Sequence, residues 1–225
     1  VSYKDALSNY SDITKFVKDS KAAKSPIIPI SAQSNLNLDA LIFSIEETIK
    51  TPERDESKNS VMHVLRSFDI NRPGTTIHDM KGGVIGGSLT QGEFKIGDEI
   101  EIKPGIVNEK KKNYEPIHTE IVSLGTGAGI VDSVKPGGLV AIGTKLDPSL
   151  TRGDSFLGSV IGRPDSLPES SDTAKLKINL FDSAVGSGKD EKIVPIKTGE
   201  SLRINIGTAP ILGKVTKANS EDIEM

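Results

Sequence analysis

Apolar residues are spaced differently in the first fifty residues and in the rest of the chain. In the first part they recur every three to four positions in two segments, Leu7–Val17 and Leu38–Ile49, which places them on one face of a helix. Ser2 and Asp5 predict a capping box at the start of the first helix. Between the segments, the apolar run Ile27–Ile30 predicts a buried strand. Together these elements predict an α/β segment that is too short to form a complete α/β domain.

A polar linker at 51–60, with Pro52 and five charged residues, leads into a different pattern. Beyond it, short runs of β-forming residues recur about every ten residues and are separated by Pro-Gly and Gly-Asp turns. This regular spacing predicts an all-β barrel over 61–165. The predicted strands are Val61–Asp69, Gly83–Leu89, Glu99–Lys103, Ile117–Leu124, Gly138–Gly143 and Phe156–Ile161.

A second polar break at Gly162–Ser171 contains two prolines, and further β-forming runs follow it. A barrel of only about four strands would keep an open edge, which natural proteins avoid, so we expect an incomplete barrel over 172–225. The predicted order is an α/β remnant (1–50), a linker (51–60), one complete barrel and one incomplete barrel. The last strands are predicted at Lys175–Phe181, Ile193–Ile196, Leu202–Ile206 and Ile211–Val215.

Composition excludes several classes of function. The chain has no Cys, which excludes disulfides, Cys-ligated metals and thiol catalysis. No apolar run approaches the ~20 residues of a membrane-spanning helix, so we expect a cytoplasmic protein with no membrane partner. The 28 Lys and Arg nearly balance 31 Asp and Glu, which excludes a strongly basic nucleic-acid coat but leaves local basic patches open. The three irregularly spaced His residues predict neither a metal site nor a catalytic group.

The glycine-rich segment Lys81–Gly87 is the most prominent motif. A phosphate-binding loop would be followed by a helix whose first N–H groups face the anion, but here a turn at Gln91-Gly92 follows. The favoured interpretation is therefore structural, with glycines that let strands approach closely or curve strongly. A third interpretation stays open, in which backbone without side chains lets a ligand lie flat on the barrel.

Two further segments carry a weak functional signal. The lysine-rich run Glu109–Asn113 is typical of a solvated hairpin tip, and a phosphate-contacting loop is its functional alternative. Ser31-Ala32-Gln33 follows the predicted strand, at the end where ligands bind in open α/β sheets. Taken alone, such a tripeptide is more often a plain loop.

Several segments, taken in order, resemble a known family. Pro26–Gln33, Asn37–Ile42 and Thr51–Asp55 resemble the end of a translational GTPase domain. Later segments, which include the LDPSL and RSFD stretches that separate the family from elongation factors, resemble the gamma subunit of archaeal and eukaryotic translation initiation factor 2. These segments are Arg66–Gly74, Lys81–Gly87, Lys135–Leu150 and Asn205–Thr208.

The resemblance implies a GTP-binding domain followed by two β-barrels, with GTP or GDP and Mg²⁺ as cofactors. It implies delivery of initiator methionyl-tRNA to the small ribosomal subunit by a heterotrimer with alpha and beta subunits, accompanied by GTP hydrolysis. The 225 residues contain no GxxxxGK[S/T] loop and no Asn-Lys-x-Asp motif. We therefore expect a fragment in which 1–50 is the C-terminal part of the GTP-binding domain, without bound nucleotide or GTPase activity of its own.

The resemblance also implies two candidate sites. Ser31, Ala32 and Gln33 correspond to the element that approaches the guanine base. The aminoacylated 3′ end of tRNA is expected on the complete barrel, where a flat glycine ribbon, an aromatic ring and cationic groups supply stacking and phosphate contacts. The candidate tRNA-binding residues are Arg66, Phe68, Arg72, Gly82, Gly83 and Lys135.

Two alternatives to this function remain open from the sequence. The barrels are shared with elongation-type and selenocysteine-specific tRNA-carrying factors. The chain can also be interpreted as a module that binds tRNA or a partner subunit without any nucleotide. Salt-sensitive binding to the tRNA acceptor arm would favour the tRNA-binding module, because phosphate contacts release counterions.

Overall fold

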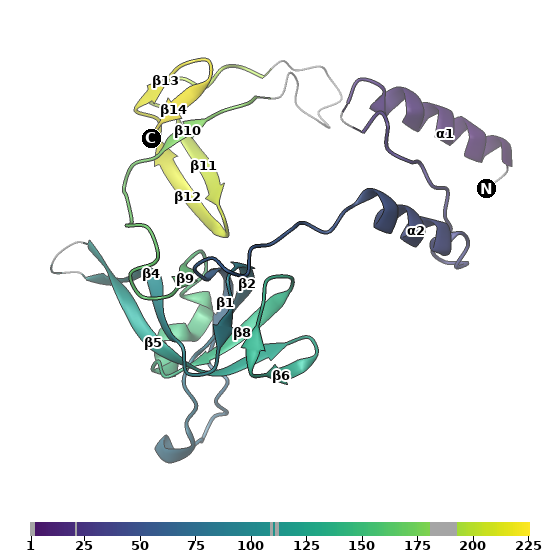
Figure 1. Ribbon diagram of the computed structural model, residues 1–225. Helices are drawn as coiled ribbons and strands as arrows, with labels where there is room; N and C mark the ends of the chain where they lie inside the picture. Colours follow the sequence, from purple (N-terminus) through teal and green to yellow (C-terminus); the bar gives the residue numbers. More distant parts are fainter. Residues whose placement is uncertain (1–2, 21, 109, 111–112, 181–192) are drawn as a thin grey trace. The chain divides into compact units, whose positions relative to one another are not determined.

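The computed structural model describes residues 3–20, 22–108, 110, 113–180 and 193–225 of the chain (Figure 1). The chain divides into two compact units, Val1–Glu53 and Arg54–Met225. The predicted capping residue Ser2 lies outside the described residues, as does most of the lysine-rich run at 109–113.

The first unit contains two helices, α1 (Tyr3–Val17) and α2 (Leu38–Thr48), as their apolar spacing predicts. Neither helix buries a residue among those described, so their apolar faces are exposed. The prediction of a buried strand at Ile27–Ile30 is wrong for this structure: the segment is extended, but it is not a strand and none of its residues is buried. The described part of this unit offers no second strand with which it could form a ladder.

The second unit begins with a closed antiparallel barrel, which confirms the predicted all-β architecture. Six strands close in the order β4-β9-β1-β2-β8-β5, because β4 pairs with both β9 and β5, and β6 extends the sheet beyond β5. The strands are β1 (Val61–Phe68), β2 (Val84–Gln91), β4 (Glu99–Asn108), β5 (Asn113–Thr126), β6 (Gly129–Val131), β8 (Leu139–Thr144) and β9 (Val160–Gly162). Short strands β3 (Phe94–Lys95) and β7 (Ser133–Val134) pair separately, and η1 (Ile77–Asp79) and η2 (Pro148–Asp154) are 3₁₀ turns.

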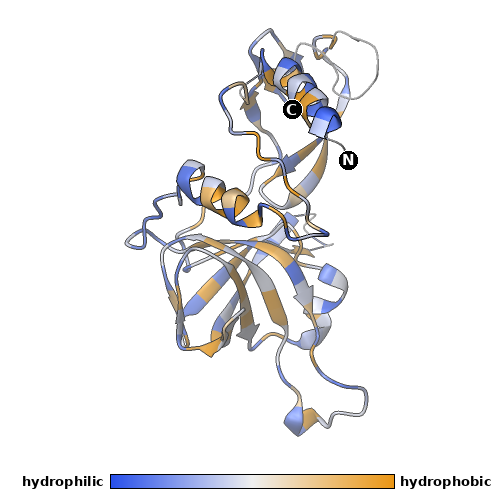
Figure 2. Cartoon of the chain, turned by 90° about the vertical axis from the view of Figure 1, so that its right-hand side faces the viewer, coloured by the Kyte–Doolittle hydropathy of each residue, from blue (hydrophilic) through white to orange (hydrophobic). Residues whose placement is uncertain are grey.

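The barrel interior is filled by apolar side chains from alternate strand positions. On β1, Met62 and Val64 are completely buried, but an irregularity between Val64 and Arg66 shifts the alternation, so that Ser67 is buried and Arg66 and Phe68 are on the outer face. Figure 2 shows hydrophobic residues interspersed with hydrophilic ones along the strands. The largest completely buried side chains in the barrel are Phe94, Met62, Ile85, Leu89, Ile100, Ile102, Ile121, Leu124, Ile142 and Ile161.

The predicted strand at Phe156–Ile161 is shorter in the structure, where β9 begins only at Val160. The preceding residues form tight turns instead: Leu157 donates to the carbonyl of Asp154 and Ser159 to that of Phe156. Asp154 and Gly158 both have positive φ, which is incompatible with a continuous strand. Phe156 still reaches the barrel core through this turn, since it is almost completely buried.

The C-terminal block at 172–225, for which an incomplete barrel is predicted, forms two small antiparallel sheets in its described residues. A three-stranded sheet in the order β10-β14-β13 packs near the hairpin β11–β12 around a small core of Val215, Ile223 and Met225. The predicted strand at Ile193–Ile196 is not a strand, and the one at Lys175–Phe181 is β10 alone up to Lys177, with Phe181 outside the described residues. The strands are β10 (Lys175–Lys177), β11 (Ser201–Ile206), β12 (Ala209–Lys214), β13 (Lys217–Ala218) and β14 (Asp222–Glu224).

The turn of the β11–β12 hairpin contacts the complete barrel at β1. The hydroxyl of Thr208 donates a hydrogen bond of 2.6 Å to the carbonyl oxygen of Val64, which also accepts from the N–H of Gly158 at 3.2 Å. Gly207, with a φ of 58°, lies directly against the imidazole of His63. The carbonyl oxygen of Val64 is therefore one point at which the hairpin is attached to β1.

Candidate functional site

A groove of about 460 Å³ lies on the outer surface of the barrel, over β1, β2, β8 and the β5–β6 turn. Arg66 is the one charged residue among those that line it, and most of the other side chains are apolar. Phe68, Ile130 and Leu139 are respectively 38%, 79% and 68% exposed at this groove. A cluster of exposed apolar side chains next to a hollow is typical of a binding site. The lining residues are Leu65, Arg66, Phe68, Gly86, Gly87, Gly125, Thr126, Gly127, Gly129, Ile130, Leu139, Val140 and Ala141.

A row of small residues that crosses the strands forms the groove floor. Arg66 on β1 lies opposite Gly86 on β2, Gly86 lies opposite Ala141 on β8, and Ala141 lies opposite Gly125 on β5. Residues in register on one face of a sheet are close neighbours. The row therefore presents almost bare backbone to a ligand, with a guanidinium at one end.

Gly86 and Gly87 support the groove in different ways. A Cβ at Gly87 would collide with the carbonyl oxygen of His63, so Gly87 permits the close approach of β1 and β2. A Cβ at Gly86 would be 3.8 Å from its nearest neighbour, the Cβ of Arg66, which is ordinary contact. Packing therefore requires glycine at 87, whereas at 86 glycine leaves open space within the groove.

Arg66 is held at the groove by Asp154 of η2. Arg66 Nε donates to Asp154 Oδ1 at 2.8 Å, and the N–H of Ser67 donates to the same oxygen at 3.0 Å. These two hydrogen bonds, with that from Arg66 as the larger effect, hold the pKa of Asp154 below its ordinary value. Asp154 is therefore a carboxylate at neutral pH and a fixed partner for Arg66.

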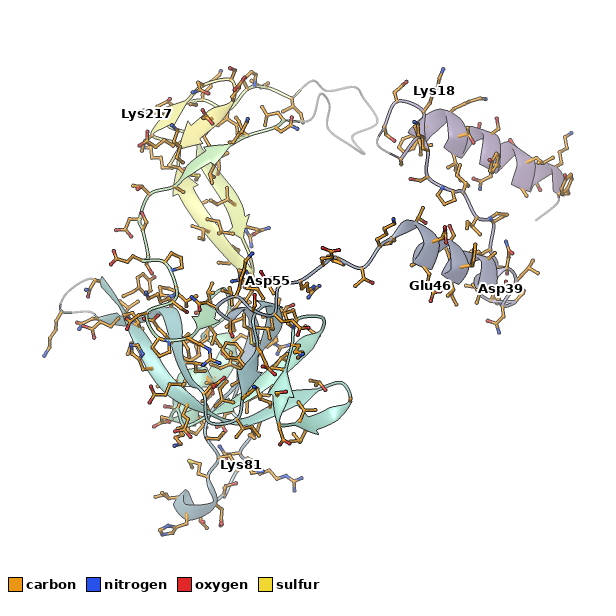
Figure 3. All side chains as sticks on the ribbon, in the orientation of Figure 1. Lys18, Asp39, Glu46, Asp55, Lys81 and Lys217 are labelled. Atoms are coloured by element: carbon orange, nitrogen blue, oxygen red, sulfur yellow. The ribbon has the colours of Figure 1, made fainter. Side chains whose placement is uncertain are left out.

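Of the residues predicted to bind tRNA, the structure brings Arg66 and Phe68 together in the groove. Gly82 and Gly83 do not line it: a Cβ at Gly82 would meet the carbonyl of Thr144, and one at Gly83 would meet the side chain of Thr151. These contacts support the structural interpretation of both glycines. Arg72 lies in the excursion between β1 and β2, which projects from the barrel near the label Lys81 in Figure 3.

Lys135 lies at a different place on the barrel. Its Nζ is 2.7 Å from Glu56 Oε2, and this hydrogen bond and charge raise the pKa of Lys135. Nearby, the N–H of Gly92 donates to the carbonyl of Asp55, and Ser60 Oγ donates to that of Glu93. Lys135 thus helps attach the segment at 54–60 to the barrel.

The loop Ser31-Ala32-Gln33 is the first part of a compact turn in the first unit. The N–H of Ser31 donates to the carbonyl of Leu36 at 3.1 Å, and the N–H of Leu36 donates back at 3.0 Å. Asn37 fixes the approach to α2, because its side-chain amide donates to the carbonyl of Pro29 at 2.8 Å. The turn borders a hollow of about 1,090 Å³ that is also lined by Tyr10 and other α1 residues.

Several groove residues were not among the sequence candidates. Ile130 and Leu139 form walls, and Asp154 orients Arg66. Ile130 and Asp154 stand in no recognised motif, and Leu139 lies in the family-like segment Lys135–Leu150 without being a candidate site residue there. A signal was present for the β5–β6 turn, where Gly125, Gly127 and Gly129 alternate with other residues. Its proximity to Arg66 depends on the pairing of β5 with β8, which is a long-range property of the barrel.

Other classes of site find little support in the described part of the chain. Within those residues, His, Asp and Glu do not gather in a group of three or more that could hold a metal ion. The same residues include no helix that is long and apolar enough to cross a membrane.

Solved structures of translation factors share this fold. A crystal structure of a bacterial selenocysteine-specific elongation factor, EF-Sec, matches 100% of this chain and 32% of that chain with a TM-score of 0.70 and 18% identity. Elongation factor SelB from Methanococcus maripaludis, in complex with the GTP analogue GppNHp, matches 94% of this chain and 41% of that chain with a TM-score of 0.61 and 17% identity. The chain thus has the fold of a part of these elongation factors.

Sequence comparison then gives the family. The translation initiation factor 2 subunit gamma of Pyrococcus horikoshii is 49% identical over 222 residues, which are 98% of this chain and 54% of that protein. The protein of the same name from Archaeoglobus fulgidus is 47% identical over 100% of this chain and 53% of its own length. The family model "Initiation factor eIF2 gamma, C terminal" matches residues 172–225. The chain belongs to the gamma-subunit family of translation initiation factor 2, and it spans about half the length of the curated relatives it matches.

Proposed function

We propose that this chain is the barrel-bearing part of an initiation factor that carries initiator methionyl-tRNA to the small ribosomal subunit. Identity near one half with archaeal gamma subunits, along nearly the whole chain, is the observation that carries the proposal. In the intact factor we infer GTP or GDP with Mg²⁺ as cofactor, alpha and beta subunits as partners, and a cytoplasmic location.

The groove on the barrel is the proposed site for the aminoacylated 3′ end of the tRNA. The bare floor lets the planar base of a terminal nucleoside approach the backbone closely, and Phe68 offers a face for stacking. Arg66 at the end of the row supplies N–H donors to a phosphate. Arg72 and Lys135 lie outside the groove and are proposed as contacts to more distant parts of the RNA.

Ser31, Ala32 and Gln33 are proposed as the last element of the guanine site. A short turn at this position can present backbone N–H groups and a hydroxyl to the carbonyl of the base. The phosphate-binding loop GxxxxGK[S/T] and the Asn-Lys-x-Asp motif of a GTPase do not occur in the 225 residues. We therefore assign GTP hydrolysis to the intact factor and not to this polypeptide.

Binding of the RNA to the full 225-residue chain tests the proposed groove. We expect initiator methionyl-tRNA to bind, and Phe68→Ala to weaken binding by roughly 5- to 100-fold, the range for loss of one stacking contact. Tyr114→Ala is a matched control, because Tyr114 is an exposed aromatic residue on β5 that does not line the groove. Equal effects of the two substitutions, or no binding by the unmodified chain, would contradict the assignment.

The likeness to selenocysteine-specific factors supplies a second candidate function. The discriminating experiment is competition between initiator methionyl-tRNA and selenocysteinyl-tRNA for the same chain without nucleotide. Preference for the initiator tRNA supports initiation, and preference for the other supports the elongation-type alternative. Tight binding to an isolated alpha subunit with no RNA affinity would instead support a scaffold for subunits.

A further inference from the structure

Two arginine–aspartate pairs cross between β1 and η2 beside the groove. Arg66 of β1 pairs with Asp154 at the end of η2, at 2.8 Å. In the opposite direction, Arg152 of η2 pairs with Asp69, which follows β1, at 3.1 Å. Each segment therefore contributes one guanidinium and one carboxylate to the boundary between β1 and η2. This boundary, with Arg66, Asp69, Arg152 and Asp154, is called the seam below.

The aspartates are anchored inward, while the arginines are directed outward. Asp154 accepts the backbone N–H of Ser67, and Asp69 accepts both the backbone and side-chain N–H groups of Asn71 at 2.8 Å. The side chains of Asp154 and Asp69 are 32% and 12% exposed, whereas those of Arg66 and Arg152 are 69% and 72% exposed. The carboxylates are therefore fixed to the backbone and the guanidiniums face solvent.

The seam itself is tied together by hydrogen bonds that do not involve these charges. Thr151 Oγ1 donates to the carbonyl of Phe68 at 3.1 Å, and the N–H of Phe156 donates to Ser67 Oγ at 3.1 Å. η2 is thus fixed along the end of β1. A guanidinium held on such a support loses little conformational freedom when it binds a ligand.

Both arginines retain N–H groups for a further partner. A guanidinium has five N–H donors, and Arg66 uses only the one on Nε for Asp154. Arg152 uses Nε and one terminal nitrogen for Asp69. The remaining donors suit phosphate oxygens, which arginine binds strongly and with defined geometry. The pKa values of Asp154 and Asp69 are both lowered, so both carboxylates stay charged at neutral pH.

We propose that Asp154 and Asp69 are positioning residues that hold Arg66 and Arg152 as a pair of phosphate-binding guanidiniums. Their ligand is the backbone of the RNA strand whose terminal nucleoside lies in the groove, so this inference rests on the function proposed above. The assignment adds Arg152 and the two acids to the RNA site. It also gives Asp154 and Asp69 a role in RNA binding, although a negative charge by itself would repel RNA.

The test uses the fact that positioning and simple charge effects predict opposite changes in the affinity for RNA. Asp154→Asn removes a negative charge next to the RNA site, so a purely electrostatic surface would bind RNA more tightly. Positioning predicts the opposite, a loss of roughly tenfold, the size of effect seen when an orienting partner is removed. We expect this loss in the Kd of initiator methionyl-tRNA for the full chain, and no further loss when the substitution is added to Arg66→Ala. Tighter or unchanged binding by Asp154→Asn would overturn the proposal.

Asp98→Asn is the matched control. Asp98 also accepts a backbone N–H, from Lys95, and pairs with an arginine, Arg163, at 3.0 Å, but it is not part of the groove or its seam. We expect this variant to bind RNA as well as or better than the unmodified chain. If it weakens binding as much as Asp154→Asn does, the effect is not specific to the seam and the proposal fails.

Salt dependence tests the arginines separately. Arg66→Ala and Arg152→Ala should each lower the slope of log affinity against log salt by about 0.7, the value for one contact to a single-stranded phosphate. An unchanged slope for either variant would remove that arginine from the site. Phe68→Ala distinguishes the two proposals: if it weakens binding and Asp154→Asn does not, the groove stands and the positioning role is wrong.

Discussion

At the scale of single residues, two adjacent glycines of β2 have different tasks. Gly87 is required by packing, because any side chain there would run into the carbonyl of His63 on the neighbouring strand. Gly86 has room for a methyl group, and its bare backbone forms part of the groove floor between Arg66 and Ala141. Gly87 is therefore needed for the packing of the barrel, whereas Gly86 leaves the floor of the groove open.

Alanine substitution should separate these tasks. Gly87→Ala is expected to lower the free energy of unfolding by about 1–3 kcal/mol, because the added methyl forces β1 and β2 apart. Gly86→Ala should change it by less than about 1 kcal/mol while weakening RNA binding, since the methyl enters the groove. Urea unfolding and a binding titration on both variants check this, and equal destabilisation by the two would contradict the distinction.

At the scale of elements, the β11–β12 hairpin is attached to the barrel through the hydroxyl of Thr208. Replacing this hydroxyl in Thr208→Val should cost about 0.5–1.5 kcal/mol of unfolding free energy, the usual contribution of one hydrogen bond. The loss should stay within that range because Val64 keeps its bond from Gly158. Thr216→Val is the comparison, since the bond from Thr216 to the carbonyl of Glu224 is exposed and water can replace it. A larger effect at 216 than at 208 would argue against attachment through the hairpin.

The helices α1 and α2 form a second kind of element, one with little tertiary support. They bury no residue among those described, and α2 has only 11 residues, fewer than the ~12–15 at which an isolated helix becomes even marginal in water. We expect their amides to exchange with solvent at least roughly 100-fold faster than those of β4 and β5, because local opening is easiest where packing is least. Hydrogen exchange measures this, and equal protection of helices and barrel would contradict it.

Sequence patterns predicted elements well where the pattern reflects local burial. Short β-forming runs between clear turns located most of the barrel strands correctly. The same reasoning failed for Ile27–Ile30, because a strand also requires a neighbour with which to pair. It failed in part at Phe156–Ile161, where Phe156 is buried through a turn and not through a strand.

The candidate site was less predictable than the fold. Arg66 and Phe68 were found because they stand in the family-like stretch Arg66–Gly74. Ile130, Leu139 and Asp154 reach the same place only through strand pairing and the path of η2, which no local pattern encodes. The many glycines in Lys81–Gly87 indicated an unusual strand. Only the contacts in the folded structure show which of these glycines is required by packing and which is exposed in the groove.

At the scale of the whole molecule, the chain divides into a unit that contains Ser31-Ala32-Gln33, the loop proposed to contact guanine, and a unit that contains the β-sheets. Because the phosphate-binding loop GxxxxGK[S/T] does not occur in the 225 residues, we predict that millimolar GTP or GDP with Mg²⁺ leaves the melting temperature of this polypeptide unchanged. No GTP hydrolysis is expected either. Thermal unfolding with and without nucleotide checks the first point, and a rise in melting temperature that grows with nucleotide concentration would contradict it.

The row Arg66–Gly86–Ala141–Gly125 also limits how this surface can evolve. Every replacement of glycine adds at least a Cβ, so the floor of the groove can become shallower by a single mutation but can hardly become deeper. The rim is under no such constraint, because Phe68, Ile130 and Leu139 can change size without disturbing the barrel interior. Divergence in what the groove accepts is therefore expected mainly at its rim, and changes in the floor are expected only to make the groove shallower.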